Sequence, residues 1–103
     1  MKVLKAAGAL AVYAACTSVA AADIRIAHVY GQTGPLEAYA EQSHIGLMLG
    51  LEYATGGTME INGEPIVVIE KDTQMDPARA RALLAGAYGD DDVDIAIGPV
   101  SSG

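Results

Sequence analysis

Hydrophobic and polar positions along the chain form stretches of two kinds, and the first kind predicts strands. Three runs rich in β-branched residues lie near residues 24–30, 66–71 and 93–98, and turn-forming or charged residues bound each of them. The middle run is continuously apolar from Ile66 to Ile69, which is typical of a strand buried on both faces. Asn62-Gly63 just before it predicts a hairpin turn whose first arm is the weaker one.

The second kind of stretch has apolar residues at helical spacing and predicts two helices. The first runs from about Leu36 or Tyr39 to Ala54, and its apolar arc is as wide as that of a helix lying on a sheet. The arc comprises Ile45, Met48, Leu49 and Tyr53, extended by Leu47, Leu51 and Ala54. The second helix opens at Asp76-Pro77, an N-cap followed by proline at the first helical position, and Gly89 closes it.

Strands and helices therefore alternate, and this order predicts an α/β fold. Right-handed crossovers between successive strands make the sheet parallel and place helices against it. We expect residues 24–98 to form a three-layer unit, a parallel sheet with flanking helices.

The first 22 residues have the composition of a secretory leader. Lys2 and Lys5 form a positive end, an uncharged alanine-rich run extends from residue 6 to residue 22, and small residues precede Asp23. We expect export and cleavage after Ala22. The run is shorter and less lipophilic than a membrane span requires, so an uncleaved anchor is the weaker interpretation.

The chain has one cysteine, Cys16, inside this leader. A chain that starts at Asp23 can therefore form no disulfide. Tyr13-Ala14-Ala15-Cys16 also resembles a lipid-attachment box, although tyrosine stands where such boxes usually carry leucine.

The net charge and the length of the chain restrict the classes of partner and of fold. The net charge is -7, and removal of the leader leaves four basic residues against thirteen acidic ones, or -9. Nucleic acid is a poor partner for such a surface. The remaining 81 residues of the 103 can form a small core, but a parallel sheet needs more cover than so few elements provide, so we expect residues 23–103 to be a fragment.

The last predicted strand leads into the best candidate for a binding loop. Gly98-Pro99 ends the strand, and Ser101-Ser102-Gly103 follows at its carboxyl end, where open parallel sheets hold ligands. Two hydroxyls beside free backbone N–H groups suit a carboxylate, which accepts short, charge-assisted hydrogen bonds. The serines are equally consistent with the cap of a following helix, and both interpretations can hold together.

Other chemistry is poorly supported. Asp90, Asp92 and Asp94 have the spacing that opens a calcium loop, but Ile95 stands where that loop needs glycine and Ser101 where it needs glutamate. The phosphate-loop and dinucleotide patterns are missing, and the final serines lack the flanking glycines of a hydrolase elbow. We therefore predict no metal, no cofactor and no catalytic residue.

His28 lies within the first predicted strand and is a possible catalytic residue. No cysteine and no suitably placed second histidine accompanies it in the sequence, so we interpret it as structural.

Taken together, residues 23–103 resemble the beginning of the periplasmic solute-binding proteins of branched-chain amino acid and amide ABC transporters. The resemblance rests on the order and spacing of several short pieces after the opening strand. These are Thr33-Gly34-Pro35, Tyr39, Gly46, Gly56-Gly57, Ile61-Asn62-Gly63, Asp72, Asp76-Pro77, Val93-Asp94, Gly98 and Ser101-Ser102-Gly103.

This resemblance implies a protein of two α/β lobes that close on a ligand in the periplasm, with residues 23–103 as the first part of the N-terminal lobe. It also implies a small amino acid, amide or other carboxylate as ligand and a membrane permease as partner. The implied ligand-binding residues are Tyr39, Ser101, Ser102 and Gly103. A ligand-sensing domain of a receptor or regulator has the same lobes and is the main alternative, with an enzyme third.

The sequence departs from the family pattern at two places. Met75 and Ser101 stand where some members carry two linked cysteines, so that link is missing. Tyr30 and Gln32 replace smaller or more apolar residues after the first strand, which leaves the size and polarity of the ligand open.

Overall fold

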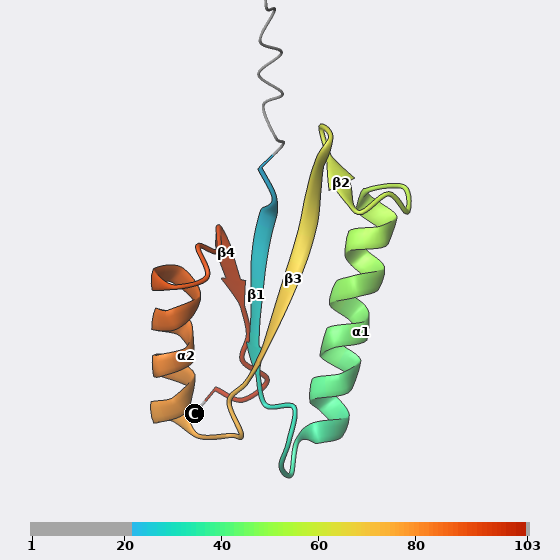
Figure 1. The fold of residues 1–103 in the computed structure, drawn as a ribbon. Helices are drawn as coiled ribbons and strands as arrows, with labels where there is room; N and C mark the ends of the chain where they lie inside the picture. Colours follow the sequence, from blue (N-terminus) through green and yellow to red (C-terminus); the bar gives the residue numbers. More distant parts are fainter. Residues whose placement is uncertain (1–21, 103) are drawn as a thin grey trace, which may run out of the picture.

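The computed structural model describes residues 22–102. They form one open sheet with a helix on each side (Figure 1). The strands are β1 (Ile24–Tyr30), β2 (Glu60–Ile61), β3 (Glu64–Asp72) and β4 (Ile95–Ile97), and the helices are α1 (Glu37–Ala54) and α2 (Pro77–Gly89). The strand order is β2-β3-β1-β4, which places the first strand of the chain inside the sheet.

Strands β1, β3 and β4 are parallel, as the sequence predicts. β1 pairs with β3 from Ile24↔Ile66 to Tyr30↔Asp72, and with β4 from Ile26↔Ile95 to His28↔Ile97. β2 and β3 form the predicted antiparallel hairpin around Asn62-Gly63, with only two paired residues on the first arm. β4 is shorter than its predicted range because Val93 and Asp94 join the sheet as a loop, with the Asp94 N–H donating to the Arg25 carbonyl over 2.8 Å.

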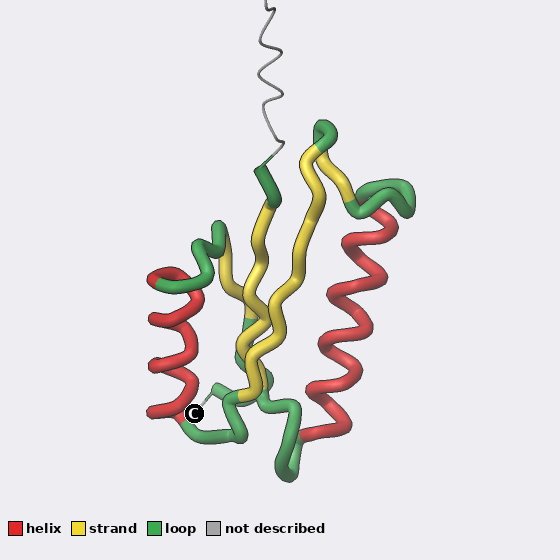
Figure 2. Tube along the Cα trace, in the orientation of Figure 1, coloured by secondary structure: helices red, strands yellow, loops and turns green. Residues whose placement is uncertain are grey.

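Alternate residues of β1 face opposite helices, and this produces three layers. Ala27 and Val29 pack with Ala87 of α2 in the main hydrophobic cluster, which is completed by Val93 and by the partly buried Ile69, Leu83 and Ala96. His28 points the other way, toward His44 of α1. The two helices accordingly flank the sheet on opposite sides (Figure 2).

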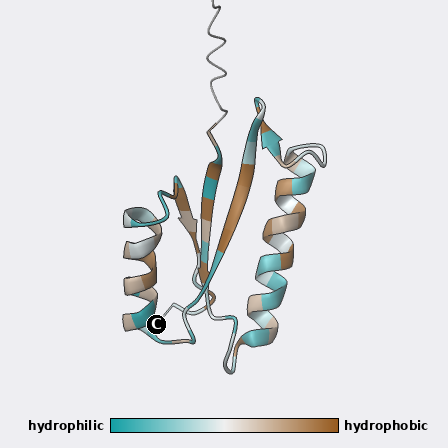
Figure 3. Ribbon diagram, viewed as in Figure 1, coloured by the Kyte–Doolittle hydropathy of each residue, from teal (hydrophilic) through white to brown (hydrophobic). Residues whose placement is uncertain are grey.

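Helix α1 presents only part of the expected apolar arc to the sheet. Its inward positions are Ala40, His44, Leu47, Met48 and Leu51, which are buried or half-buried. Ile45, Leu49 and Tyr53 of the expected arc are 50%, 60% and 91% exposed. The inward face includes Ala40, the one buried residue of this helix, and His44, so the helix contacts the sheet with one side of its hydrophobic arc. Figure 3 shows the apolar middle of β3 and the mixture of apolar and polar residues along α1.

Helix α2 begins as the sequence predicts. The Asp76 carboxylate accepts hydrogen bonds from the N–H groups of Ala78 and Arg79, and Pro77 occupies the first turn. Neither helix within residues 22–102 is long and apolar enough to cross a membrane.

Candidate functional site

Three loops meet at the carboxyl edge of the parallel strands, because parallel strands all end at the same edge. They are residues 31–36 after β1, 73–76 after β3 and 98–102 after β4, at the bottom of Figure 1. This edge is where open α/β sheets bind ligands.

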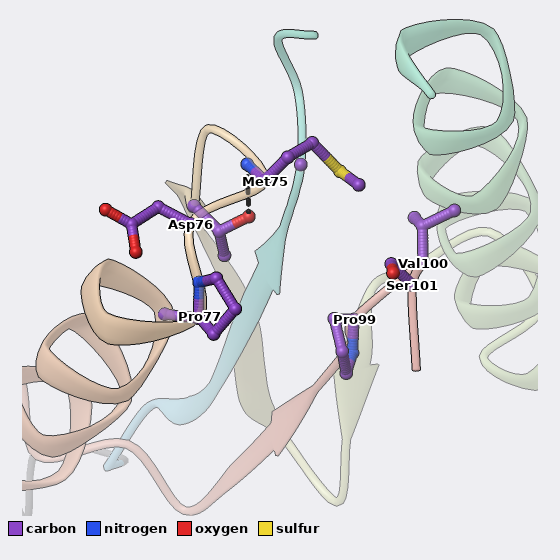
Figure 4. A pocket seen from close by; sticks show the side chains of 9 residues that line it. Met75, Asp76, Pro77, Pro99, Val100 and Ser101 are labelled. Atoms are coloured by element: carbon purple, nitrogen blue, oxygen red, sulfur yellow. Dashed lines mark hydrogen bonds between the residues drawn. The ribbon is translucent and has the colours of Figure 1, made fainter. Parts of the chain in front are cut away.

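A small pocket of about 60 Å³ lies between these loops (Figure 4). Gly31 comes from the first loop, Thr73 and Met75 from the second, and Val100 and Ser101 from the third. The start of α2 and Pro99 complete the wall. In Figure 4 the Met75 side chain extends from its loop toward the side on which Val100 and Ser101 lie.

Asp72 organises the first loop from the end of β3. Its carboxylate accepts hydrogen bonds from the Gln32 N–H at 2.9 Å, from the Thr33 hydroxyl at 2.9 Å and from the Gln74 N–H at 2.9 Å. These hydrogen bonds, led by that from Gln74, hold the pKa of the Asp72 carboxyl below its usual value. Asp72 therefore connects the loops that follow β1 and β3.

The second loop turns sharply at two residues with left-handed backbone. Gln74 and Met75 have φ values of 53° and 59°, which non-glycine residues adopt only when their surroundings hold them there. Buried Thr73 provides that support: its N–H donates to the Tyr30 carbonyl, and its hydroxyl accepts from the Met75 N–H. The resulting turn places Met75 against Gly31, where an added Cβ would lie 2.6 Å from the Met75 sulfur.

Gly98 brings the third loop against the end of β1. Its φ is +140°, and a Cβ at this position would lie 1.8 Å from the Val29 carbonyl oxygen. Only glycine fits so close a backbone approach. The Gly98–Pro99 peptide that follows is cis.

The structure brings together some of the residues predicted to form the site. Ser101 is half-buried and lines the pocket, whereas Ser102 is exposed beside it in the chain. Tyr39 is 64% exposed in the first turn of α1 and is not among the described residues that line this pocket. Gly103 lies outside the described residues.

Sequence reasoning missed the role of Asp72 and a partner of His28. The expectation that no second histidine is suitably placed was wrong, because the Nδ1 atoms of His28 and His44 are 3.0 Å apart. The crossover from β1 to α1 brings the two histidines together. No local pattern in the sequence reveals this contact. His28 is fully buried and away from the pocket, as a structural residue would be.

Among the described residues, no group of three or more histidine, cysteine or acidic side chains is arranged to hold a metal ion. Asp91 and Asp94 of the acidic segment instead make contacts with basic residues and backbone. Asp91 pairs with Lys71 and Asp94 accepts from the Arg25 N–H. These contacts connect the loop before β4 to β1 and β3.

The chain matches a family model and solved structures. The family model described as periplasmic binding protein matches residues 23–103. A solved ABC transporter protein from Rhodopseudomonas palustris is 61% identical, with a TM-score of 0.76 over 78% of this chain and 24% of that one. A second structure from that organism, described as an ABC-type branched-chain amino acid transporter, is also 61% identical, with a TM-score of 0.74 over 75% of this chain and 21% of that one.

The chain thus spans less than a quarter of the length of these two solved structures. No curated protein matches it.

Proposed function

Because the chain belongs to the periplasmic binding protein family, we propose that the full-length protein is the extracytoplasmic substrate-binding component of an ABC importer. It captures a small solute that carries a carboxylate or an amide, such as an amino acid. It passes this solute to a membrane permease and performs no reaction on it. The description of one relative as a branched-chain amino acid transporter supports the ligand class.

The observation that carries this proposal is the convergence of three loops on one pocket at the carboxyl edge of the sheet. The pocket is small, at about 60 Å³, and it is open on one side. Such a pocket suits one polar end of a ligand. A site of this size fits a protein in which a second lobe closes over the rest of the ligand.

We assign the polar end of the ligand to the last loop. Ser101, Ser102 and Gly103 would offer hydroxyl and backbone N–H donors to a carboxylate, and the position of Ser101 on the pocket wall supports this assignment. Tyr39 would contribute an aromatic wall to the larger cleft. Its exposure in the first turn of α1, near the same edge of the sheet, leaves its ring available for contact.

Residues 1–22 would act as the leader that directs export, with cleavage after Ala22, and residues 23–103 would form the first part of the N-terminal lobe. The leader lies outside the described residues, apart from Ala22. The family match begins at residue 23, which supports this division.

Titration calorimetry on the full-length protein tests the proposal. The panel contains branched-chain amino acids, their amides and aromatic acids, each paired with the primary alcohol that lacks the carboxylate. We expect saturable binding of at least one acid or amide, much weaker binding of its alcohol, and recovery of the ligand unchanged. Equal affinity for an acid and its alcohol would show that the serine loop does not recognise a carboxylate.

A further inference from the structure

Four side chains form a polar cluster between α1 and the sheet, on the face opposite the main hydrophobic cluster. His28 and Tyr30 come from β1, Glu70 from β3 and His44 from α1. The rings of His28 and Tyr30 stack with their centroids 3.7 Å apart, and the His44 ring lies nearly parallel to both. His28 is 1% exposed.

The contact between the two histidines holds one hydrogen. The Nδ1 atoms of His28 and His44 lie 3.0 Å apart, so one of them carries a hydrogen and the other accepts it. His44 Nε2 is 3.4 Å from the Glu70 carboxylate, which also accepts a hydrogen bond from the Tyr30 hydroxyl. The Glu70 carboxylate therefore faces His44, and either Nδ1 atom of the pair can carry the shared hydrogen.

Protonation of both imidazoles would place a hydrogen on each of the two facing Nδ1 atoms. The hydrogen bond would be lost, and two like charges would face each other at a buried site. The titratable groups around His28 are His44 from α1, Glu70 from β3 and Tyr30 from its own strand. Glu37 and Glu41 of α1 line the open pocket of about 440 Å³ beside the cluster, together with Glu70.

Burial lowers the pKa of His28, and the nearby His44 lowers it further, against the opposing effect of Glu70. A histidine whose pKa is lower in the folded state stabilises the fold fully above its unfolded pKa near 6.5. That stabilisation is lost as pH falls through the folded value. Acid therefore acts against the cluster.

Helix α1 meets the sheet outside the main hydrophobic cluster, and this polar cluster is part of its contact. The main hydrophobic cluster contains residues of α2, β1, β3 and β4 with Val93, and none from α1. Ala40 is the one fully buried residue of α1, as Ala87 is of α2, and Leu47, Met48 and Leu51 of α1 are half-buried. If the polar contacts fail, only these side chains remain to hold α1 on the sheet.

We propose that the His28–His44 pair is an acid-sensitive latch that holds α1 against the sheet. The latch is closed while the two facing Nδ1 atoms share one hydrogen, and a second proton opens it. Opening loosens α1, and with it the first-turn residue Tyr39, while α2 and the main hydrophobic cluster remain in place. This latch belongs to the lobe itself and does not depend on the ligand proposed above.

Hydrogen exchange on the full-length protein, at about pH 7.5 and about pH 5, tests the latch on either side of the ordinary histidine pKa. Exchange is corrected for the intrinsic effect of pH, and α2 serves as the internal reference. In the wild type we expect the α1 amides to lose roughly tenfold in protection at the lower pH, with α2 protection little changed.

The variant His44→Gln is the matched control. Its amide can donate to neutral His28 or accept from protonated His28, and it gains no charge. We expect the pH dependence of α1 protection in this variant to be smaller than in the wild type, because the repulsion from His44 is gone while the burial of His28 still acts. The double variant His28→Val/His44→Phe removes both titrating groups and keeps apolar contact, and its α1 protection should differ by less than about twofold between the two pH values.

Two results would overturn the latch. One is equal α1 protection at both pH values in the wild type. The other is a full wild-type pH dependence in His44→Gln, or in the double variant if His44→Gln does not fold.

Discussion

Ser101 and Ser102 are adjacent, yet the structure gives them different surroundings. Ser101 is half-buried on the pocket wall, and Ser102 is exposed. Under the proposed function, the exposed hydroxyl is the one that a ligand and a second lobe would cover. The two residues are therefore expected to respond differently to substitution, with Ser102 reporting directly on ligand binding and Ser101 also on loop structure.

Replacing Ser102 with alanine should weaken ligand binding without unfolding the protein. A hydrogen bond to a charged group is worth about 1.5 to 3 kcal/mol, which corresponds to roughly ten- to hundredfold in affinity. Calorimetry with the ligand identified from the panel measures the change. The same substitution at Ser43, exposed on α1, should leave the dissociation constant unchanged. An unchanged constant for Ser102→Ala would mean that this serine is only a helix cap.

Asp72 allows a prediction on pH. Asp72→Asn removes the charge that accepts hydrogen bonds from the loops after β1 and β3, so the folded protein should lose about 1 kcal/mol after allowance for solvent screening. The pKa of this carboxyl is lowered in the folded state. Its contribution is therefore complete above the unfolded pKa of 3.8 and lost as pH falls through the lower folded value.

Thermal unfolding of wild type and Asp72→Asn across acidic pH checks this prediction. The difference in Tm between them should be constant near neutral pH and shrink below about pH 4. Asp23→Asn, at an exposed carboxylate before β1, should show little difference at any pH. A difference for Asp72→Asn that does not change with pH would mean that the carboxylate is not the stabilising species.

At the scale of elements, local patterns predict position along the chain well. β1 and the start of α2 agree with their predicted bounds because β-branched runs, an Asp-Pro cap and glycine stops are all encoded within a few residues. The hairpin at Asn62-Gly63 is confirmed for the same reason. β4 is shorter than predicted because its ends are set by contacts with Arg25 and Val29, far away in the sequence.

Orientation is harder to predict than position. The hydropathy pattern of α1 favours the side with Ile45 and Leu49, but the helix packs through Ala40 and His44. That choice depends on His28 and Glu70 lying opposite one another on adjacent strands, a consequence of the β1–β3 register. Asp72 likewise acquires its role only when that register places it beside the loop after Tyr30.

The junction between β4 and β1 is sensitive to one methyl group. Gly98→Ala would force a Cβ into the Val29 carbonyl oxygen at a φ of +140°, so we expect a loss of about 3 kcal/mol or more in unfolding free energy. Gly50→Ala in α1 is the matched control, since a Cβ there meets nothing within 4 Å. It should stabilise the protein by up to about 1 kcal/mol through helix propensity.

Chemical denaturation of the full-length variants measures both changes. Comparable stability of Gly98→Ala and wild type would show that the loop after β4 can move away from β1 without cost.

At the scale of the whole molecule, the sheet has an open side. β4 is an edge strand, and Ile95 and Ile97 are 50% and 37% exposed, with Leu84 of α2 nearby at 41%. Such an edge invites pairing with another strand. The two solved relatives are more than four times as long as the part of each that this chain covers.

The maturation of the protein is testable by mass. Intact-mass measurement or N-terminal sequencing of the exported protein should find Asp23 as the first residue, since small residues precede it and the uncharged run ends there. A start at Cys16 with attached lipid would replace this with an anchored protein. Retention of Met1 would contradict both forms of processing.

The position of β1 inside the sheet has a consequence for when the chain folds. β1 is the first element made, yet its partners are Ile66 to Asp72 and Ile95 to Ile97, more than forty and almost seventy residues later. During synthesis the strand must wait for both, because pairing over such separations is slow to form. A ribosome that has released only β1 and α1 holds a chain without its central contacts. If residues 1–22 direct export as proposed, such a chain can still be threaded through a narrow translocation channel, which a protein folded around its first strand could not enter.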